Sequence, residues 1–103
     1  MKRTTIVVHS DVEKFISTLQ EKTIAKVLRI IDLLERFGFR LGMPHTKKIQ
    51  NNLFELRIKG KQEVRFFYGF KQGKIELVHG FIKKQNKISA KEIYQAVKSL
   101  ENI

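Results

Sequence analysis

The stretch "LFELRIKGKQEVRFFYGF", residues 53–70, carries the clearest structural signal of the sequence. Apolar and polar side chains alternate over residues 53–59 and again over residues 64–70, which is the pattern of β-strands. The connection Gly60-Lys61-Gln62 is short, so the two strands should be antiparallel neighbours. The stretch therefore predicts a β-hairpin.

Arg57 and Arg65 lie on this hairpin at positions that alternate with its large apolar side chains. If the apolar side chains face the core, both arginines share the opposite face of the sheet. Two guanidiniums held there would form a rigid anion site whose geometry suits a phosphate group. The alternative is structural: Arg57 pairs with Glu55 or Glu63, and Arg65 covers apolar surface with its aliphatic stem.

The flanking sequence predicts the remaining elements. They are a strand over residues 3–8, a helix from residue 10, a helix over 21–37, a long connection over 38–52, a strand over 75–82 and a helix over 89–102. Ser10 with Glu13 and Ser89 with Glu92 have the spacing of capping boxes. The order β-α-α-β-β-β-α predicts a single α+β domain over residues 1–103. Its antiparallel sheet should have the helices packed on one face and the other face open to a partner.

The net charge is strongly positive and unevenly distributed. The chain carries 21 Lys and Arg against 10 Asp and Glu, a formal net charge of +11. Residues 1–42 have a net charge of +3 and residues 43–103 have +8. A polyanionic partner, either nucleic acid or an acidic protein, is the natural expectation.

Several kinds of site are excluded or unsupported by the sequence. Without cysteine there can be no disulfide, thiolate metal site or cysteine nucleophile. No histidine pair has metal-ligand spacing, and no phosphate-binding loop or dinucleotide glycine pattern occurs, so we expect neither metal nor cofactor. The N-terminal apolar run, Ile6-Val7-Val8, is too short for the core of a signal peptide, so we expect a cytoplasmic protein.

Two lysine groups are candidates for phosphate contact. Lys83, Lys84 and Lys87 lie between the strand over 75–82 and the last helix, while Lys47 and Lys48 lie in the long connection. The alternative for both groups is a solvated charge run.

Three further side chains could take part in a site. His45 follows Pro44 in the basic connection and could be exposed and titrate, whereas His79 alternates with Leu77 and is better explained as a hydrogen-bonded core histidine. Tyr94 lies one position from the apolar stripe of the last helix, where it could pack or present its hydroxyl to a phosphate.

Four motifs in register resemble the RelE/ParE toxin superfamily, and within it the HigB-like, phage-derived branch of type II toxin–antitoxin systems. They are "LFELR" (53–57), "RFFY" (65–68), "HGFIKK" (79–84) and a final helix that opens with the acidic Glu92. The segment "PHTKKI" (44–49) is similar to the stretch that precedes the sheet in this family. The resemblance covers about half of the chain strongly and implies a RelE-like fold.

The resemblance implies a metal-independent endoribonuclease that enters the ribosomal A site and cuts mRNA there, where it would also contact rRNA. By position, Arg65 matches the sheet arginine of this group, Tyr94 falls where the RelE tyrosine lies, and Lys83, Lys84 or Lys87 would supply the remaining charge. We expect Arg57 and Arg65 to bind the phosphate and a lysine of residues 83–87 or His45 to take part in proton transfer, so the candidate catalytic residues are Arg57, Arg65, Lys83, Lys84, Tyr94 and His45. The basic residues expected to bind RNA or the ribosome are Lys47, Lys48, Lys59 and Lys87. The implied protein partner is an antitoxin, in this branch a HigA-like helix-turn-helix protein.

Two other functions remain open from the sequence. A ParE-like protein would share the fold but poison a topoisomerase, and a non-catalytic module would only bind RNA or the antitoxin. Cutting of translated mRNA, stabilised DNA cleavage complexes, and binding without toxicity are the observations that separate the three.

Overall fold

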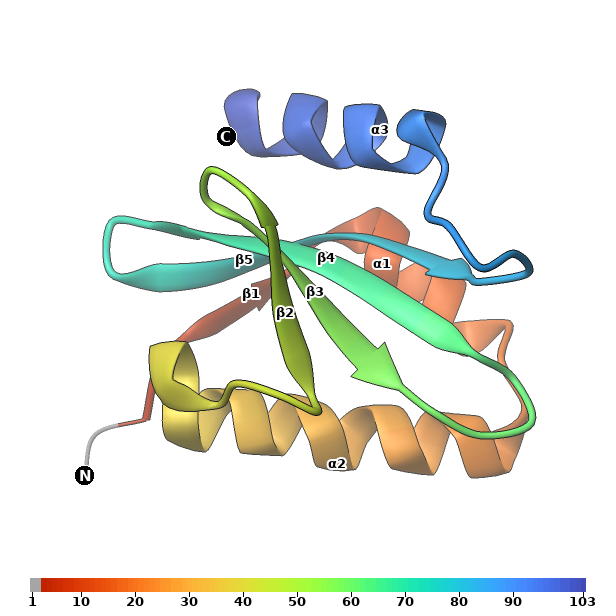
Figure 1. Ribbon diagram of the computed structural model, residues 1–103. Helices are drawn as coiled ribbons and strands as arrows, with labels where there is room; N and C mark the ends of the chain where they lie inside the picture. The colour runs from red at the N-terminus through yellow and green to blue at the C-terminus, as the bar shows by residue number, and fades with distance from the viewer. Residues whose placement is uncertain (1–2) are drawn as a thin grey trace.

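A five-stranded sheet forms the centre of the protein in the computed structural model, which describes residues 3–103 (Figure 1). The strands are β1 (Ile6–Val8), β2 (Thr46–Gln50), β3 (Leu53–Ile58), β4 (Val64–Lys71) and β5 (Lys74–Ile82). The helices are α1 (Ser10–Ser17), α2 (Glu21–Phe37) and α3 (Ala90–Glu101), with a short 3-10 turn, η1 (Gly38–Arg40). The α+β class predicted from the sequence is therefore confirmed, and the β3–β4 hairpin has nearly its predicted bounds.

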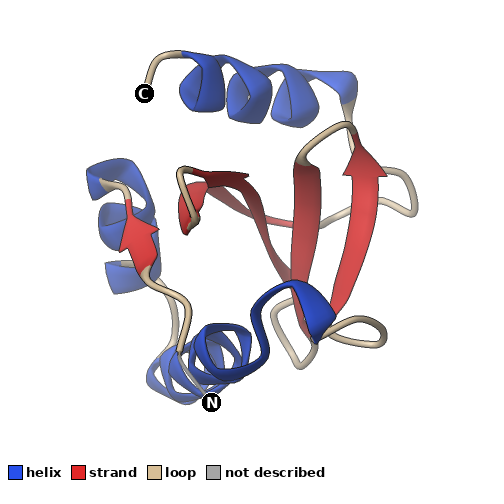
Figure 2. Ribbon diagram, turned by 90° about the vertical axis from the view of Figure 1, so that its left-hand side faces the viewer, coloured by secondary structure: helices blue, strands red, loops and turns tan. Residues whose placement is uncertain are grey.

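The helices lie on both faces of the sheet, which corrects the expectation that all would pack on one face (Figures 1 and 2). Helices α1 and α2 cover the face that carries Leu56, Phe66 and Leu77. Helix α3 packs on the opposite face against Phe67 and Phe81. The reason lies in β4, where adjacent phenylalanines point to opposite faces and both need burial. Only part of the arginine-bearing face is therefore open to a partner.

Two strand positions differ from the predicted order. β2 lies within the predicted connection, antiparallel to β3, because Gly42 and Pro44 end the preceding segment and Thr46–Gln50 can then extend along the edge. β1 pairs with β5 in parallel, with Ile6 opposite Ile75, so the sheet is mixed rather than wholly antiparallel. The strand order is β1-β5-β4-β3-β2.

The two predicted capping boxes behave differently. α1 starts at Ser10 itself, and its N-cap is His9, which makes no side-chain capping bond. At α3 the hydroxyl of Ser89 accepts a hydrogen bond from the backbone N–H of Glu92, as predicted. The Glu92 carboxylate does not complete the box, because it bonds His79 on β5.

A bulge in β5 turns His79 toward α3. Phe67 pairs with His79 and Tyr68 with Leu77, so Val78 is the extra residue between these pairs. Leu77 packs in the α1–α2 core, whereas Val78 packs under α3. The simple alternation that grouped His79 with Leu77 is wrong here, because the bulge shifts the pleat by one residue.

A close contact fixes the β2–β3 turn against β4. The side-chain amide of Asn52 donates to the carbonyl of Phe70 at 2.9 Å and accepts from its N–H at 2.9 Å. A Cβ on Gly69 would lie only 2.5 Å from the carbonyl oxygen of Asn52 and 2.9 Å from Leu100 of α3. Glycine at this position thus lets the turn, β4 and α3 meet.

None of the helices between residues 3 and 103 is both long and apolar enough to cross a membrane.

Candidate functional site: an arginine–glutamate cluster on the sheet

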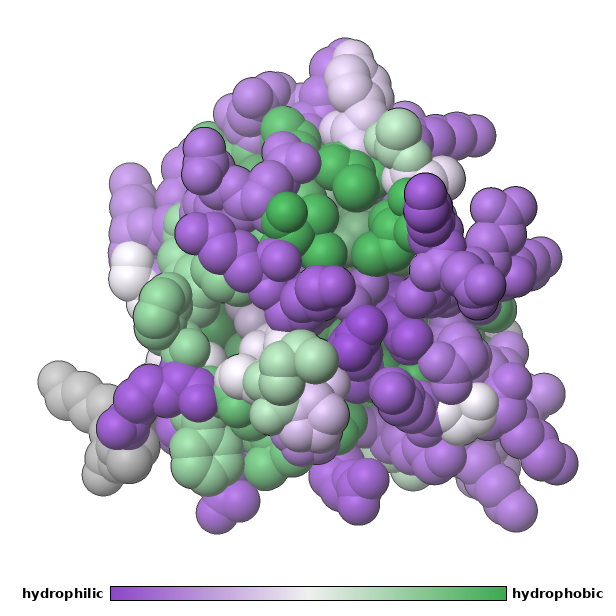
Figure 3. Space-filling model, in the orientation of Figure 1, coloured by the Kyte–Doolittle hydropathy of each residue, from purple (hydrophilic) through white to green (hydrophobic). Residues whose placement is uncertain are grey.

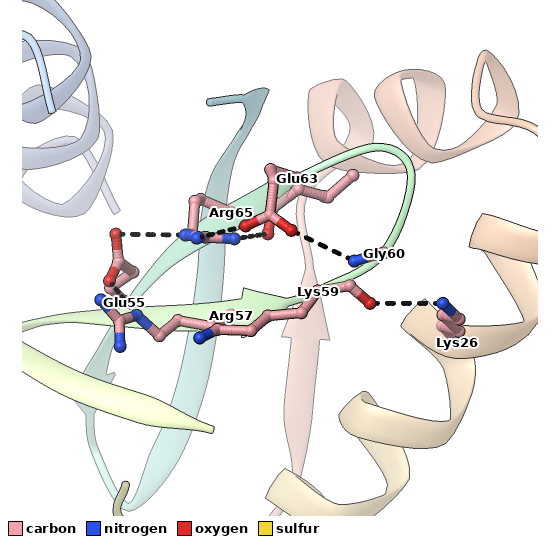
Figure 4. A network of polar contacts seen from close by, with 8 residues as sticks. Lys26, Glu55, Arg57, Lys59, Gly60, Glu63 and Arg65 are labelled. Atoms are coloured by element: carbon pink, nitrogen blue, oxygen red, sulfur yellow. Dashed lines mark hydrogen bonds and ion pairs between the residues drawn. The ribbon is translucent and has the colours of Figure 1, made fainter. Parts of the chain in front are cut away.

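Arg57 of β3 and Arg65 of β4 are direct cross-strand partners on the face that also carries α3. The alternation in the sequence predicted this shared face correctly. Together with Glu55 and Glu63 they form what we call the sheet-face cluster (Figure 4). The four side chains come from rigid strands and the turn between them, which holds their mutual geometry.

Glu55 lies between the two arginines. Its side chain is only 1% exposed; Oε1 accepts a hydrogen bond from Arg57 Nε at 3.0 Å, and Oε2 lies 3.8 Å from Arg65 Nε. These last two atoms, Glu55 Oε2 and Arg65 Nε, are buried without a hydrogen-bond partner. Buried polar atoms left in this way are uncommon and often mark functional positions.

Glu63 holds the other side of Arg65. Its Oε1 accepts from Arg65 Nη2 at 2.9 Å, and its Oε2 accepts from the backbone N–H of Gly60 at 3.2 Å. The hydrogen bond from the Arg65 guanidinium, helped by the Gly60 N–H, lowers the pKa of the Glu63 carboxyl below its usual value. Arg65 Nη1 donates to the carbonyl of Val64 at 2.9 Å, so this guanidinium is fixed on three sides.

The two arginines differ in what a ligand can reach. The Arg57 side chain is 19% exposed, whereas the Arg65 side chain is 4% exposed. Two carboxylates also balance two guanidiniums within the cluster. In this arrangement Arg57 can meet a ligand directly, while Arg65 contributes mainly by orienting Glu55 and Glu63.

Lys83 adds positive charge beside the cluster. Its backbone N–H donates to the carbonyl of Glu63 at 2.7 Å, which continues the β4–β5 pairing past the end of β5. Since alternate residues share a face, Lys83 follows Phe81 on the face of Arg65. Of the three candidate lysines, Lys83 is thus the one that the backbone brings alongside the arginines.

Lys84 and Lys87 line a pocket with Lys83 at the start of α3. This lysine pocket has a volume of about 180 Å³, and Ser89 and Glu92 also line it. Its lysines come from one segment, residues 83–87, so the chain gathers them without long-range contacts. The pocket is open enough and basic enough to receive a small anion.

His79 lies under the first turn of α3. Its ring stacks on Phe67 and Phe81, with centroids 6.2 and 5.7 Å away, and Nε2 lies 3.0 Å from Glu92 Oε1. The expectation of a hydrogen-bonded, packed histidine is therefore confirmed. The contact joins β5 to the helix that borders the lysine pocket.

His45 and Lys59 lie elsewhere, in a pocket of about 160 Å³ between α2 and the end of β3. Arg57 also lines this pocket, together with Lys26 and Arg29 of α2. Sequence reasoning missed these two helix residues. The available signal was their i, i+3 spacing on the polar side of a strongly amphipathic helix.

Lys47 of the edge strand β2 is the cross-strand partner of Glu55, so the pairing places it beside the cluster, whereas Lys48 pairs with Phe54 on the opposite face of the sheet. Lys47 and Lys48 are exposed on the edge strand β2 and line a pocket with the exposed Phe39 and Met43. Tyr94 on α3 is 58% exposed, and Lys98 Nζ lies 5.6 Å from the centre of its ring. Tyr94 is not among the residues that line the lysine pocket.

Within residues 3–103, no group of three or more histidine, aspartate or glutamate side chains is arranged to hold a metal ion.

Comparison with known protein families gives one match. A family model described as "Phage derived protein Gp49-like (DUF891)" matches residues 14–101, which span α2, the whole β2–β5 sheet and α3. The comparison with curated proteins gives no match.

Proposed function

Since the chain belongs to the Gp49-like family of phage-derived proteins, which is associated with the toxins of toxin–antitoxin systems, we propose that it is an endoribonuclease that cuts mRNA on the ribosome. The supporting observation is the sheet-face cluster, which holds a partly exposed Arg57 and an oriented Arg65 on rigid strands, with Lys83 next to Glu63 at its border. The net charge of +11 suits a ribosomal partner made largely of RNA.

The reaction that suits these residues uses the RNA's own 2′-hydroxyl. That oxygen attacks the adjacent phosphorus, a new O2′–P bond forms, and the P–O5′ bond breaks to leave a cyclic phosphate and a 5′-hydroxyl. One proton leaves the 2′-oxygen and one reaches the 5′-oxygen. The protein must align the reacting atoms and stabilise the negative charge of the five-coordinate phosphorus.

We assign the phosphate contacts to Arg57 and Lys83. Arg57 has the partly exposed guanidinium, and Lys83 lies on the same face of the sheet beside Glu63, past the end of β5. Arg65 and Glu55 act as positioning residues, because both are buried and hold the guanidinium of Arg57 through the Glu55 carboxylate. Buried, hydrogen-bonded supports of this kind keep a site in one geometry before the substrate arrives.

We assign proton transfer to the lysine pocket or to His45. Lys84 and Lys87 line this pocket beside Lys83, where an amine can reach a bound phosphate. His45 lines a pocket that also includes Arg57. Tyr94 keeps a role only as an exposed ring on α3 that can stack with a base or contact rRNA.

Induced expression followed by primer extension on a cellular mRNA tests this function. Wild-type protein should produce new 5′ ends within translated sequence, and blocked translation should remove them. Arg57→Ala and Lys83→Ala should each lower cleavage by about 100-fold, the size expected for one group that stabilises transition-state charge. Lys91→Ala, an exposed lysine outside the cluster, is the matched control.

The assignment is wrong if both variants cleave like the control at equal expression. The Arg65→Ala and Lys84→Ala pair extends the test: full growth inhibition by both would remove these residues from the site. Stabilised DNA cleavage complexes without mRNA cutting would instead support a topoisomerase poison.

A toxin of this family implies an antitoxin partner. We propose that it is a HigA-like helix-turn-helix protein with an acidic segment, because the chain carries a formal net charge of +11. Co-purification with the protein encoded beside it tests this, and a basic or absent neighbour would contradict it.

A further inference from the structure

The pocket between α2 and β3 is a second basic site, next to the sheet-face cluster. Its lining residues are Lys26, Arg29, Ile30, Pro44, His45, Arg57, Ile58 and Lys59. Five of these eight residues are basic and none is acidic. We call this site the basic pocket; its volume is about 160 Å³.

The elements around the basic pocket hold its cations close together. Lys26 and Arg29 follow each other at i, i+3 on α2, which places them on one side of the helix. Lys26 Nζ donates to the carbonyl of Lys59 at 3.3 Å, which ties the helix to the end of β3 (Figure 4). Like charges at this spacing repel, so an anion between them would relieve the repulsion.

The floor of the basic pocket is rigid and apolar. Ile30 and Ile58 line it, and both are buried members of the α1–α2 core. An anion that binds there therefore meets exposed basic side chains beside a poorly solvating apolar wall, and charge–charge attraction is stronger in such a site than at an open surface.

Arg57 connects the two sites. It lines the basic pocket, and its Nε donates to Glu55 in the sheet-face cluster at 3.0 Å. A phosphate beside the Arg57 guanidinium and a second anion in the basic pocket would thus both neighbour this residue. A nucleic-acid strand presents this arrangement, with one charge on every nucleotide along a continuous backbone.

We propose that the basic pocket binds a phosphate group of single-stranded RNA, adjacent along the strand to the phosphate that Arg57 and Lys83 contact. This inference rests on the proposed function. The phosphate contact would fix where the RNA strand lies on the protein. Phosphate contacts of this kind set position and register without reading the base sequence. The site would therefore strengthen RNA binding equally for different sequences.

Binding of an RNA of about eight nucleotides with 2′-O-methyl riboses tests the proposal. This probe cannot be cut, because it lacks the attacking hydroxyl. Fluorescence anisotropy over a salt series compares wild type, Lys26→Gln with Arg29→Gln, and the control pair Lys14→Gln with Arg36→Gln. The control removes the same charge from exposed positions on α1 and α2 outside the pocket.

We expect the pocket variant to bind about tenfold more weakly than the control, with the slope of log affinity against log salt reduced by about 0.7. The loss should be the same for oligonucleotides of different sequence. Circular dichroism checks that both variants fold. Equal affinities and slopes for the pocket variant and the control would overturn the proposal.

Two further measurements separate other occupants. In a nuclear magnetic resonance titration, inorganic phosphate should shift the amide signals of His45 and Lys59 only at high concentration. If inorganic phosphate bound as tightly as the RNA does, the pocket would be a site for a free anion and the assignment to an RNA strand would be wrong. If the pocket variant lost antitoxin binding but kept RNA binding, the basic pocket would bind an acidic segment of the antitoxin, and the assignment to an RNA phosphate would be wrong.

The cleavage assay tests the proposed function separately from this binding assay. If wild-type protein leaves translated mRNA uncut, the proposed nuclease activity is contradicted. A selective loss of RNA binding by the pocket variant would still support the pocket as a phosphate site.

Discussion

At the scale of single residues, Glu55 organises the site, although the sequence drew attention to its arginine neighbours. It is the buried carboxylate between two guanidiniums, and one of its oxygens has no hydrogen bond. A carboxylate at this depth is tolerated because the charges on both sides compensate its lost hydration. Its function is thus to hold Arg57 and Arg65 in place.

Glu55→Gln should lower both stability and activity. The amide cannot balance the buried guanidinium of Arg65, so the free energy of unfolding should fall by about 1–3 kcal/mol. Urea denaturation measures this loss, and Glu101→Gln, an exposed change on α3, is the control. Cleavage should fall more than stability explains; a variant that keeps full cleavage would contradict the positioning role.

Tyr68 gives a test in alkaline solution. Burial raises the pKa of its hydroxyl to about 12, and a hydrogen bond with Thr46 offsets only part of this effect. The unfolded chain loses the same proton near pH 10. Tyr68 therefore stabilises the fold fully below pH 10, and this contribution is lost as the pH rises from 10 through 12.

Tyr68→Phe should accordingly lose less stability than wild type between pH 10 and 12, a difference of up to about 3 kcal/mol. Because the chain has two tyrosines and no tryptophan, near-ultraviolet phenolate absorbance can follow each tyrosine in single variants. Tyr94→Phe is the control, since Tyr94 is exposed. Identical pH dependence in the two variants would refute the assignment.

At the scale of elements, α3 and the β2–β3 turn are locked together through Gly69. The Cβ of an alanine there would collide with the backbone of Asn52, which cannot move without breaking its two bonds to Phe70. This junction limits how closely α3 and the β2–β3 turn can pack against β4 when residue 69 carries a side chain.

Gly69→Ala should destabilise the protein by about 1–3 kcal/mol through overpacking. Thermal unfolding measures this change. Gly60→Ala is the control, because its Cβ would meet only the flexible end of Lys26. A Gly69→Ala melting temperature within error of the control would show that the junction can relax.

Sequence periodicity predicted the elements well where the pattern was local. α2 and the β3–β4 hairpin follow from their own spacing, and the hairpin register brought Arg57 opposite Arg65. β2 was missed because an edge strand with one buried face and two lysines resembles a polar connection. The side of the sheet that α3 occupies was also missed, since it depends on Phe67 and on a bulge at Val78 that no spacing reveals.

Part of the candidate site could also be predicted from local spacing. Alternation along the hairpin shows which of its residues share a face of the sheet. Lys26 and Arg29, in contrast, reach the basic pocket from a helix about thirty residues before β3. Sequence spacing also does not predict the burial of Arg65, because that burial depends on which other parts of the chain pack over the strand. Tertiary packing, and not local propensity, fixes both features.

At the scale of the whole molecule, charge dominates the surface. The face drawn in Figure 3 is mostly hydrophilic at its rim, with apolar side chains gathered beneath α3. With a net charge of +11, the field of the protein should steer acidic partners over distances beyond direct contact.

The association rate constant with the antitoxin should therefore fall by about tenfold or more as salt rises from roughly 0.05 to 0.5 M, because screening shortens the reach of the field. Stopped-flow fluorescence measures it. The dissociation rate constant should change much less. A rate constant that does not depend on salt would show that the antitoxin relies on apolar contact alone.

The pairing of β1 with β5 has a consequence for the order of synthesis. Ile6 leaves the ribosome early, yet its partner Ile75 is made only after most of the chain, and α3 follows later still. The sheet that carries the arginines cannot close until then, so the sheet-face cluster forms only after most of the chain has been made. Nascent chains arrested before β5 should be digested rapidly by protease, whereas released chains should resist; early protection would contradict this delay.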